Sequence, residues 1–568
     1  MDLLQRSVAE YEKEFEMLEK YQITDPQDPD FGGYYNKDFG VVAQNCGSAA
    51  AKPMTLYFCP QSRYYKDPRA LACADGLVQH LLNHLHPDGT MDYYSCNFHS
   101  APDTAFVTLA LAKPAKLVKA ETPEEKAFQK KLFLVLRRMG DGMVEEGFHT
   151  PNHRWVISAA LALLNTLMPD ERYVARIDQY LAEHIDCNED GEYAERSAGG
   201  YNEINNRALL ILAQDLGKTE LLEYVRRNLE MMPVFYHTDF SIFTENSRRQ
   251  DKGTAPYAEK YAYQYLLCGH ALHDEALRAI GTTQLEACIR CGRPFPLAAE
   301  DLMLFPEAFQ NLPAPAGPEL FEVDRLLKGS GLLRLSRGGL NLWAVERQPA
   351  FLFLKKGGID FYIKGGISFF NCRHLLMENI RPCGDGYEME YEGTGQYYQP
   401  FGEYQGTNDW WEMDHSRRRT SGHLSVKVKA TVTPVDDGFD IRVQPWGCPA
   451  STIRFEFGIL PNVLIHGEGY RIPANAGGSL VAAKGELELF DGKDTVSVGP
   501  GFAVNDVIKG LFGAVPASED RFNLYFNDVT NFDRRFSIRR LFKRAGQKVR
   551  QNLQRHVFKR AGWAVPQL

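Results

Sequence analysis

The sequence predicts two domains, an N-terminal (α/α) toroid of helical hairpins followed by an antiparallel β-sandwich. From residue 1 to about 300, apolar residues recur at helical spacing between loops rich in Gly, Pro, Asp and Asn. Four prolines between 306 and 318 then mark a linker. After this linker the pattern changes to short alternating runs separated by Gly-Gly and Asp-Gly turns. Helices followed by strands indicate separate domains rather than an α/β fold.

The predicted helices of the first domain, residues 1–300, each carry an apolar stripe. In the first of them, Val8, Phe15 and Leu18 lie on one face. We expect consecutive helices to pair as hairpins and the hairpins to form a ring, with loops lining one end. The predicted helices cover residues 3–18, 71–85, 105–111, 127–139, 155–167, 173–185, 208–216, 221–232 and 257–272.

The second predicted domain, residues 301–531, consists of strands, and a basic tail, 532–568, follows it. The tail carries eleven Lys and Arg residues against one acid, Asp533. We expect it to be helical, and to pack on the sandwich or to contact a polyanion, an acidic partner or a membrane surface. The predicted strands cover residues 332–335, 340–345, 350–354, 359–363, 424–432, 439–443, 453–460 and 486–490.

The composition is that of a globular protein, with 44% hydrophobic and 24% charged residues in 568. A net charge of −9 argues against bulk binding of nucleic acid, so any anionic substrate must meet a local basic cluster. Aromatic residues make up 12% of the chain, which suits an aromatic core and also the binding of sugar faces.

The sequence also bears on cellular location. The first residues lack the apolar region of a signal peptide, and no apolar run approaches the length of a transmembrane helix. The 11 cysteines are scattered without paired metal-type spacing. We therefore expect a cytoplasmic protein with reduced thiols, and we leave a homo-oligomer open.

Two short stretches predict a functional site in the first domain. Pro151 suits the first turn of a helix, which places Asn152 and His153 near the positive end of that helix. A glycine-rich loop with Gly191 and Gly200 leads past Tyr201 into a second apolar helix, 208–216. An amide, an imidazole and a phenol beside an anion-binding helix end can remove a proton next to a carboxylate.

The order of these motifs resembles that of the heparinase II/III-like polysaccharide lyases and the related alginate and chondroitin lyases. The Asn-His pair at 152–153 comes first, and Gly-Tyr-Asn at 200–202 follows one hairpin later. Three further stretches resemble the earlier cleft helix, the arginine-bearing segment and the tryptophan turn of these enzymes, namely 97–104, 245–250 and 408–413. The resemblance covers most of residues 50–470.

This resemblance implies cleavage of a uronic-acid glycan by β-elimination, with an anionic uronate oligosaccharide as substrate. Asn152 and His153 would hydrogen-bond the carboxylate, and Arg248 or Arg249 would add positive charge. Tyr201 would protonate O4, and His374 or His153 would take the C5 proton. Tyr201 could serve as both acid and base when both groups lie on one face of the sugar. The expected substrate-binding residues are Asn97, His99, Asn246, Arg249, Trp410 and Trp411.

The chain also departs from the family pattern. The Pro-Gly-Thr-Thr that often follows the tryptophan turn is absent, and the histidine-rich zinc cluster of some relatives is not evident. No cofactor is required for the expected reaction, and we predict no metal in the site. A structural Zn or Ca ion in the sheet domain, near His374, His415 or His466, is left open.

Other functions remain open from the sequence. A glycoside hydrolase on the same toroid would need two carboxylates in its cleft. A carbohydrate-binding protein without turnover would need only the fold. The uronate, the endo or exo mode and the syn or anti geometry are not determined. The carboxylates available to a hydrolase are Asp103, Asp190, Glu192, Glu195 and Glu203.

Overall fold

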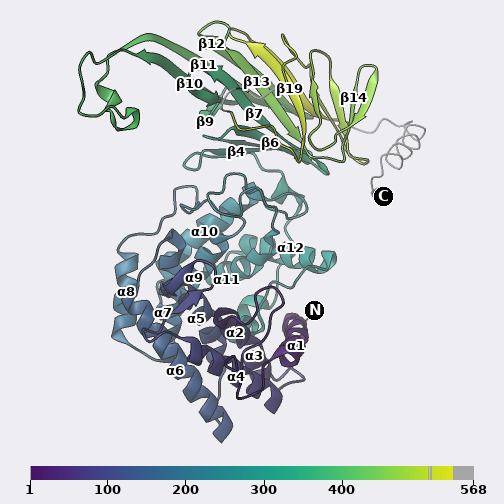
Figure 1. Ribbon diagram of the computed structural model, residues 1–568. Helices are drawn as coiled ribbons and strands as arrows, with labels where there is room; N and C mark the ends of the chain where they lie inside the picture. The colour runs from purple at the N-terminus through teal and green to yellow at the C-terminus, as the bar shows by residue number, and fades with distance from the viewer. Residues whose placement is uncertain (1, 509–510, 512–513, 542–568) are drawn as a thin grey trace. The chain divides into compact units, whose positions relative to one another are not determined.

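The computed structural model describes residues 2–508, 511 and 514–541. The chain divides into a helical unit that ends at Leu320 and a sheet unit that begins at Phe321 (Figure 1). This order of helices and then strands confirms the predicted fold class.

The helical unit also holds a short hairpin, β1 (Met91–Tyr93) and β2 (Asn97–Ser100). Among the described residues, none of the helices is both long and apolar enough to cross a membrane. The helices are α1 Leu3–Tyr21, α2 Ala43–Ala49, α3 Ala51–Phe58, α4 Pro68–His84, α5 Ala101–Ala115, α6 Pro123–Glu145, α7 Pro151–Leu167, α8 Glu171–Leu181, α9 Tyr201–Leu216, α10 Leu222–Met231, α11 Ala262–Leu272, α12 Glu275–Cys291 and α13 Ala299–Leu304.

The helices form an inner and an outer layer, and burial distinguishes them. Helix α7 is buried almost all round from Asn152 to Leu164, and it packs between α5 and α9. Helix α8 buries only Tyr173, Ile177 and Tyr180, so it is amphipathic and lies outside. Helix α1 packs against α13, so that the first and last helices of the unit meet and close the ring.

The boundary between the units lies later than predicted, because residue 300 falls inside α13. Tyr11 of α1 donates a hydrogen bond to Glu300 at 2.9 Å, and Lys113 of α5 pairs with Asp301 at 2.7 Å. These buried polar contacts bind the segment after residue 300 into the helical unit. Two of its four prolines begin short 3-10 turns, Pro306–Phe309 and Pro318–Phe321.

The sheet unit is a sandwich of two sheets, each nine-stranded within the described residues. One sheet has the order β15-β14-β17-β18-β20-β12-β11-β10-β9, and the other β16-β19-β13-β7-β6-β5-β4-β3, with β8 paired to β7. All pairings are antiparallel except β16 with β19. Apolar side chains of both sheets form one core, for example Val428 of β11 and Phe457 of β13.

The strands have the following bounds. They are β3 Arg325–Leu327, β4 Leu332–Arg337, β5 Leu340–Val345, β6 Ala350–Lys356, β7 Ile359–Phe369, β8 Cys372–His374, β9 Glu378–Cys383, β10 Gly386–Tyr398, β11 Thr420–Val435, β12 Gly438–Gly447, β13 Thr452–Ile459, β14 Leu464–Gly467, β15 Tyr470–Pro473, β16 Ser479–Val481, β17 Leu487–Phe490, β18 Thr495–Gly499, β19 Phe522–Val529 and β20 Arg534–Arg540.

The beginning of the predicted helical tail is a strand, which corrects that prediction. Strand β20 lies between β12 and β18 and is hydrogen-bonded to both. Its Phe536 and Ile538 lie on either side of Ser537 and point into the core, which is the period of a strand. The arginines pair with carboxylates: Arg534 with Asp528 at 2.8 Å, and Arg539 with Asp440. The rest of the predicted tail, 542–568, lies outside the described residues.

Candidate active site

The predicted site residues of the helical unit gather where α5, α7 and α9 begin. Helix α7 starts at Pro151, so Asn152 and His153 occupy its first turn. Helix α9 starts at Tyr201, directly after Gly200. Asp103 of the first turn of α5 is close enough to His153 to act on its pKa. Three helix N-termini, each with a partial positive charge, therefore lie at one place.

Glu195 joins the predicted residues to one another. The Asn152 amide donates to both carboxylate oxygens of Glu195, at 2.9 and 3.0 Å, and the Arg249 Nε lies 3.3 Å from the same carboxylate. Glu195 is only 3% exposed, and burial raises its pKa against the opposing effect of Asn152 and Arg249. The sequence marks Glu195 only as a spare carboxylate, and this role as a hub follows from the folded chain alone.

The Tyr201 hydroxyl is held by the arginine-bearing segment. Arg249 Nη2 donates to it at 3.2 Å, and the guanidinium carbon lies 4.5 Å from the centre of the Tyr201 ring. The hydroxyl in turn donates to Gln250 Oε1 at 3.3 Å. Gln250 is a contact that the sequence did not single out.

His153 is a neutral imidazole at physiological pH. Burial, together with His149 and Arg249, lowers its pKa to about 4, while Asp103 acts in the opposite sense. His153 is 8% exposed, and its Nδ1 has no hydrogen-bond partner among the described residues. The His149 ring meets it edge to face, with centroids 4.7 Å apart. A neutral ring with an unused nitrogen can accept a proton from a bound ligand.

The remaining predicted residues of this unit lie around this cluster with different partners. Asn97 donates to Asp103 at 3.0 Å, and Asn246 donates to Glu192 at 2.8 Å. Arg248 is exposed, with Nη1 3.5 Å from the Ala194 carbonyl oxygen. The structure thus separates the two arginines. The Arg249 side chain contacts the side chains of Tyr201 and Glu195, whereas Arg248 reaches Glu195 through its main-chain N–H, which donates to the Glu195 carbonyl oxygen at 3.1 Å.

His99 belongs to a different polar cluster on the β1–β2 hairpin. Its Nδ1 binds the Asp88 carboxylate, and its ring stacks on His86 with centroids 3.9 Å apart. The Asp88 carboxylate raises the pKa of His99. The side chain is exposed, and its contact with substrate stays a prediction.

His374, Trp410 and Trp411 belong to the sheet unit. His374 Nε2 accepts a hydrogen bond from the Val515 amide at 2.9 Å, and burial together with Lys364 lowers its pKa. The tryptophans lie in a turn between β10 and β11, and Trp411 is 89% exposed. That His374, Trp410 and Trp411 act in one site with Asn152 stays a prediction.

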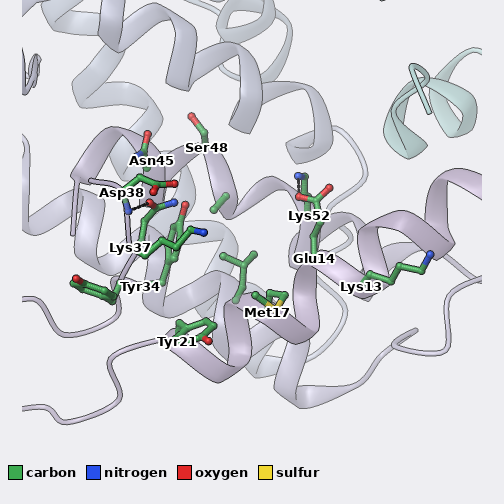
Figure 2. A pocket seen from close by; sticks show the side chains of 14 residues that line it. Lys13, Glu14, Met17, Tyr21, Tyr34, Lys37, Asp38, Asn45, Ser48 and Lys52 are labelled. Carbon is green, nitrogen blue, oxygen red and sulfur yellow. Dashed lines mark hydrogen bonds and ion pairs between the residues drawn. The ribbon is translucent and has the colours of Figure 1, made fainter. Parts of the chain in front are cut away.

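A separate pocket of about 1000 Å³ lies in the helical unit. Met17 and Tyr21 of α1 form one side of it, and Tyr34 and Lys37 of the segment before α2 form another (Figure 2). None of the predicted site residues lines it. Among the described residues, the group with metal-ligand chemistry is Asp30, His80 and His84, in the helical unit rather than the sheet domain.

No family model matches this chain, and no curated protein matches it by sequence. Solved structures share its fold, among them three polysaccharide lyases. A Paenibacillus xanthan lyase matches with a TM-score of 0.58 and 10% identity over 97% of this chain, and this chain spans only 58% of that lyase. A mutant heparan sulfate lyase from Pedobacter heparinus matches with 0.55 and 10% identity, covering 96% of this chain and 84% of that one. A mutant chondroitin AC lyase from Streptomyces coelicolor A3 matches with 0.55 and 11% identity, covering 96% and 81%.

These matches confirm the fold expected from the resemblance to heparinase-like polysaccharide lyases, a helical toroid followed by a β-sandwich. At identities of 10–11%, these matches establish the fold but not the reaction, which depends on the residues of the site.

Proposed function

We propose that this chain is a polysaccharide lyase that cleaves uronate glycans by β-elimination at the start of α7 and α9. The observation that carries the proposal is the contact of the Tyr201 hydroxyl with Arg249, which Glu195 connects to Asn152. An acid or base, a cation and an amide thus converge where helix N-termini favour an anion. The lyase fold of the matched structures supports the same conclusion.

The chemistry requires the charge of the uronate carboxylate to be offset. The C5 proton is too weakly acidic while the neighbouring carboxylate is fully charged, so the enolate-like intermediate must be stabilised. Arg249 and the N-terminus of α7 supply positive charge, and the first-turn amide of Asn152 lies beside them. In the substrate-free chain this amide is directed at Glu195. We propose that the substrate carboxylate takes over part of that hydrogen bonding.

Two proton transfers complete the elimination. A base takes the C5 proton, the C4–O4 bond breaks, a C4=C5 double bond forms, and the leaving O4 receives a proton. Tyr201 is the proposed acid for O4, and it can first act as base when both groups lie on one face of the sugar. His153 is neutral and has an unused nitrogen, which makes it a base for the opposite face. His374 of the sheet unit is an alternative to it.

The buried carboxylates of the helical unit support a hydrolase less well than a lyase. Glu192 and Glu195 are already engaged by the amides of Asn246 and Asn152. Glu203 accepts a hydrogen bond from Gln264 at 2.8 Å. A hydrolytic pair needs one carboxyl that protonates the leaving oxygen and one that faces water or the sugar. Because Glu192, Glu195 and Glu203 already accept hydrogen bonds from amides, the site favours elimination over hydrolysis.

The test is to incubate the chain with hyaluronan, chondroitin, heparan, alginate, glucuronan and xanthan, and to follow near-ultraviolet absorbance and new reducing ends. A lyase yields both signals in equal amounts, because each cleavage forms one conjugated double bond. New reducing ends without absorbance would show a hydrolase. Binding of a glycan with neither signal would show a carbohydrate-binding protein.

A further inference from the structure

Two histidines of α4 face an aspartate of the preceding segment. His80 and His84 are four residues apart, so they lie on one face of the helix. Asp30 approaches them from the loop after α1. One ligand atom from each of the three side chains can be chosen so that all lie within 4.8 Å of one another. Two imidazoles and a carboxylate are ligands that divalent transition metals prefer.

The hydrogen bond of His84 Nδ1 orients the ring so that its other nitrogen, Nε2, faces the Asp30 carboxylate. His84 Nδ1 lies 2.8 Å from the His80 carbonyl oxygen, which can only accept, so Nδ1 carries the proton. In the neutral ring, the Nε2 lone pair then faces Asp30 Oδ1 at 3.6 Å. Two acceptors repel each other unless a positive charge lies between them. The separation exceeds that of an N–H···O bond, and it is close to the roughly 3.4 Å between two ligands of a tetrahedral zinc ion.

His80 supplies the second, independent observation. It is 1% exposed, and neither of its ring nitrogens has a hydrogen-bond partner among the described residues. The main-chain groups of Asp30 and Phe31 approach the ring but do not meet the geometry of a hydrogen bond with either nitrogen, and the centroid of the His84 ring lies 4.0 Å away. A buried imidazole without a partner costs free energy, and a bound cation would supply the missing interaction.

We infer that Asp30, His80 and His84 bind one divalent transition-metal ion of the Zn²⁺ type, with water as a fourth ligand. The donor set excludes Ca²⁺ and Mg²⁺ as preferred ions, because these take oxygen ligands. The hydrogen bond of His84 Nδ1 to a backbone carbonyl is the arrangement that orients metal-bound histidines.

The ion would fasten the segment between α1 and α2 to α4. Gly33 makes the close approach to His80 feasible, because a Cβ at this residue would lie 2.9 Å from His80 Nδ1. Directly after it, Tyr34 to Asp38 form a wall of the pocket in Figure 2. The metal would therefore hold that wall in place. This inference does not depend on the proposed lyase activity.

The experiment titrates the chelator-treated full chain with Zn²⁺ by calorimetry and repeats the titration with Asp30→Asn and His84→Ala. We expect one tight site in the parent, weakened by about 100-fold in either variant, and a Zn²⁺-dependent rise in Tm of roughly 2 °C or more in the parent alone. His270→Ala is the matched control, since His270 also lies in the last turn of a helix, α11. It should bind as the parent does.

Co²⁺ separates this site from the free thiols of the chain. A site of nitrogen and oxygen ligands gives visible bands of tetrahedral Co²⁺ without thiolate charge-transfer absorbance. Thiolate bands, no stoichiometric Zn²⁺ binding in the parent, or equal affinity in Asp30→Asn and His84→Ala would each overturn the inference. Circular dichroism of both variants checks that they are folded.

Discussion

The guanidinium of Arg249 lies against the ring of Tyr201 and donates a hydrogen bond to its hydroxyl at 3.2 Å. The same arginine contacts the buried carboxylate of Glu195 at 3.3 Å. A single side chain therefore connects the phenol that opens α9 with the carboxylate that holds Asn152 of α7.

Tyr201→Phe should lower kcat by about 10²–10⁴-fold and leave substrate binding largely intact, because it removes a proton transfer and not the ring. Tyr257→Phe is the matched control. Tyr257 also has an arginine over its ring, Arg293 at 3.5 Å, but lies outside the proposed site. Steady-state kinetics and glycan binding on both variants are the measurement. A Tyr201→Phe enzyme with more than about a tenth of the parental kcat would remove Tyr201 from the mechanism.

Arg249→Gln and Arg248→Gln should differ. Arg249 donates a charge-assisted hydrogen bond to Tyr201, a type worth about 1.5–3 kcal/mol, so its loss should lower kcat/KM by at least about tenfold. Arg248 is exposed, and its loss should change kcat/KM by less than about threefold. Parallel kinetics at one ionic strength decide the point. Equal losses in both variants would mean that the contacts with Tyr201 and Glu195 do not matter to the reaction.

Asn152→Ala should lower both kcat and Tm. The amide is fully buried and donates to Glu195, so its removal leaves a buried carboxylate short of a donor at a cost of about 1–3 kcal/mol. The loss of one positioned donor should also lower kcat by about 10²–10³-fold. Asn228→Ala is the control, since Asn228 is equally buried and donates to the Gly191 carbonyl oxygen at 2.8 Å. It should lower Tm while kcat per folded molecule is kept. A similar pattern in Asn152→Ala would assign that residue a structural role only.

The free energy of unfolding should depend on pH through His153. Its pKa falls from the ordinary 6.5 to about 4 in the folded chain, so between these values the unfolded chain binds more protons. Stability should therefore fall as the pH drops from 6.5 towards 4, by up to roughly 3 kcal/mol. Glu195 acts in the opposite sense, because its raised pKa lets the folded chain bind a proton first as the pH falls.

Denaturant unfolding across pH 4–7 on the parent and on His153→Gln measures this contribution. The variant should lose the part of the slope that His153 causes. The same slope in both proteins would show that His153 does not titrate as its burial indicates.

Much of the fold followed from the sequence, because the apolar period is a local property. The stripe of α1 and the alternation of β11 both correspond to buried faces in the folded chain. Helices α2, α3, α12 and α13 were not predicted. The strand β20 was taken for part of a helical tail, because its run of arginines conceals two inward-facing apolar residues. Its place between β12 and β18 depends on partners far away in the sequence.

For the site, the sequence by itself determined the residue types and their positions at helix starts: Asn152 and His153 on α7, and Tyr201 on α9. Only the tertiary structure decided which of them touch. Glu195 became the hub because folding buried it between Asn152 and Arg249, and burial makes each partner energetically important. The choice of Arg249 over Arg248 has the same cause. Neighbouring side chains in a loop point in different directions, and no local pattern indicates which one meets the phenol.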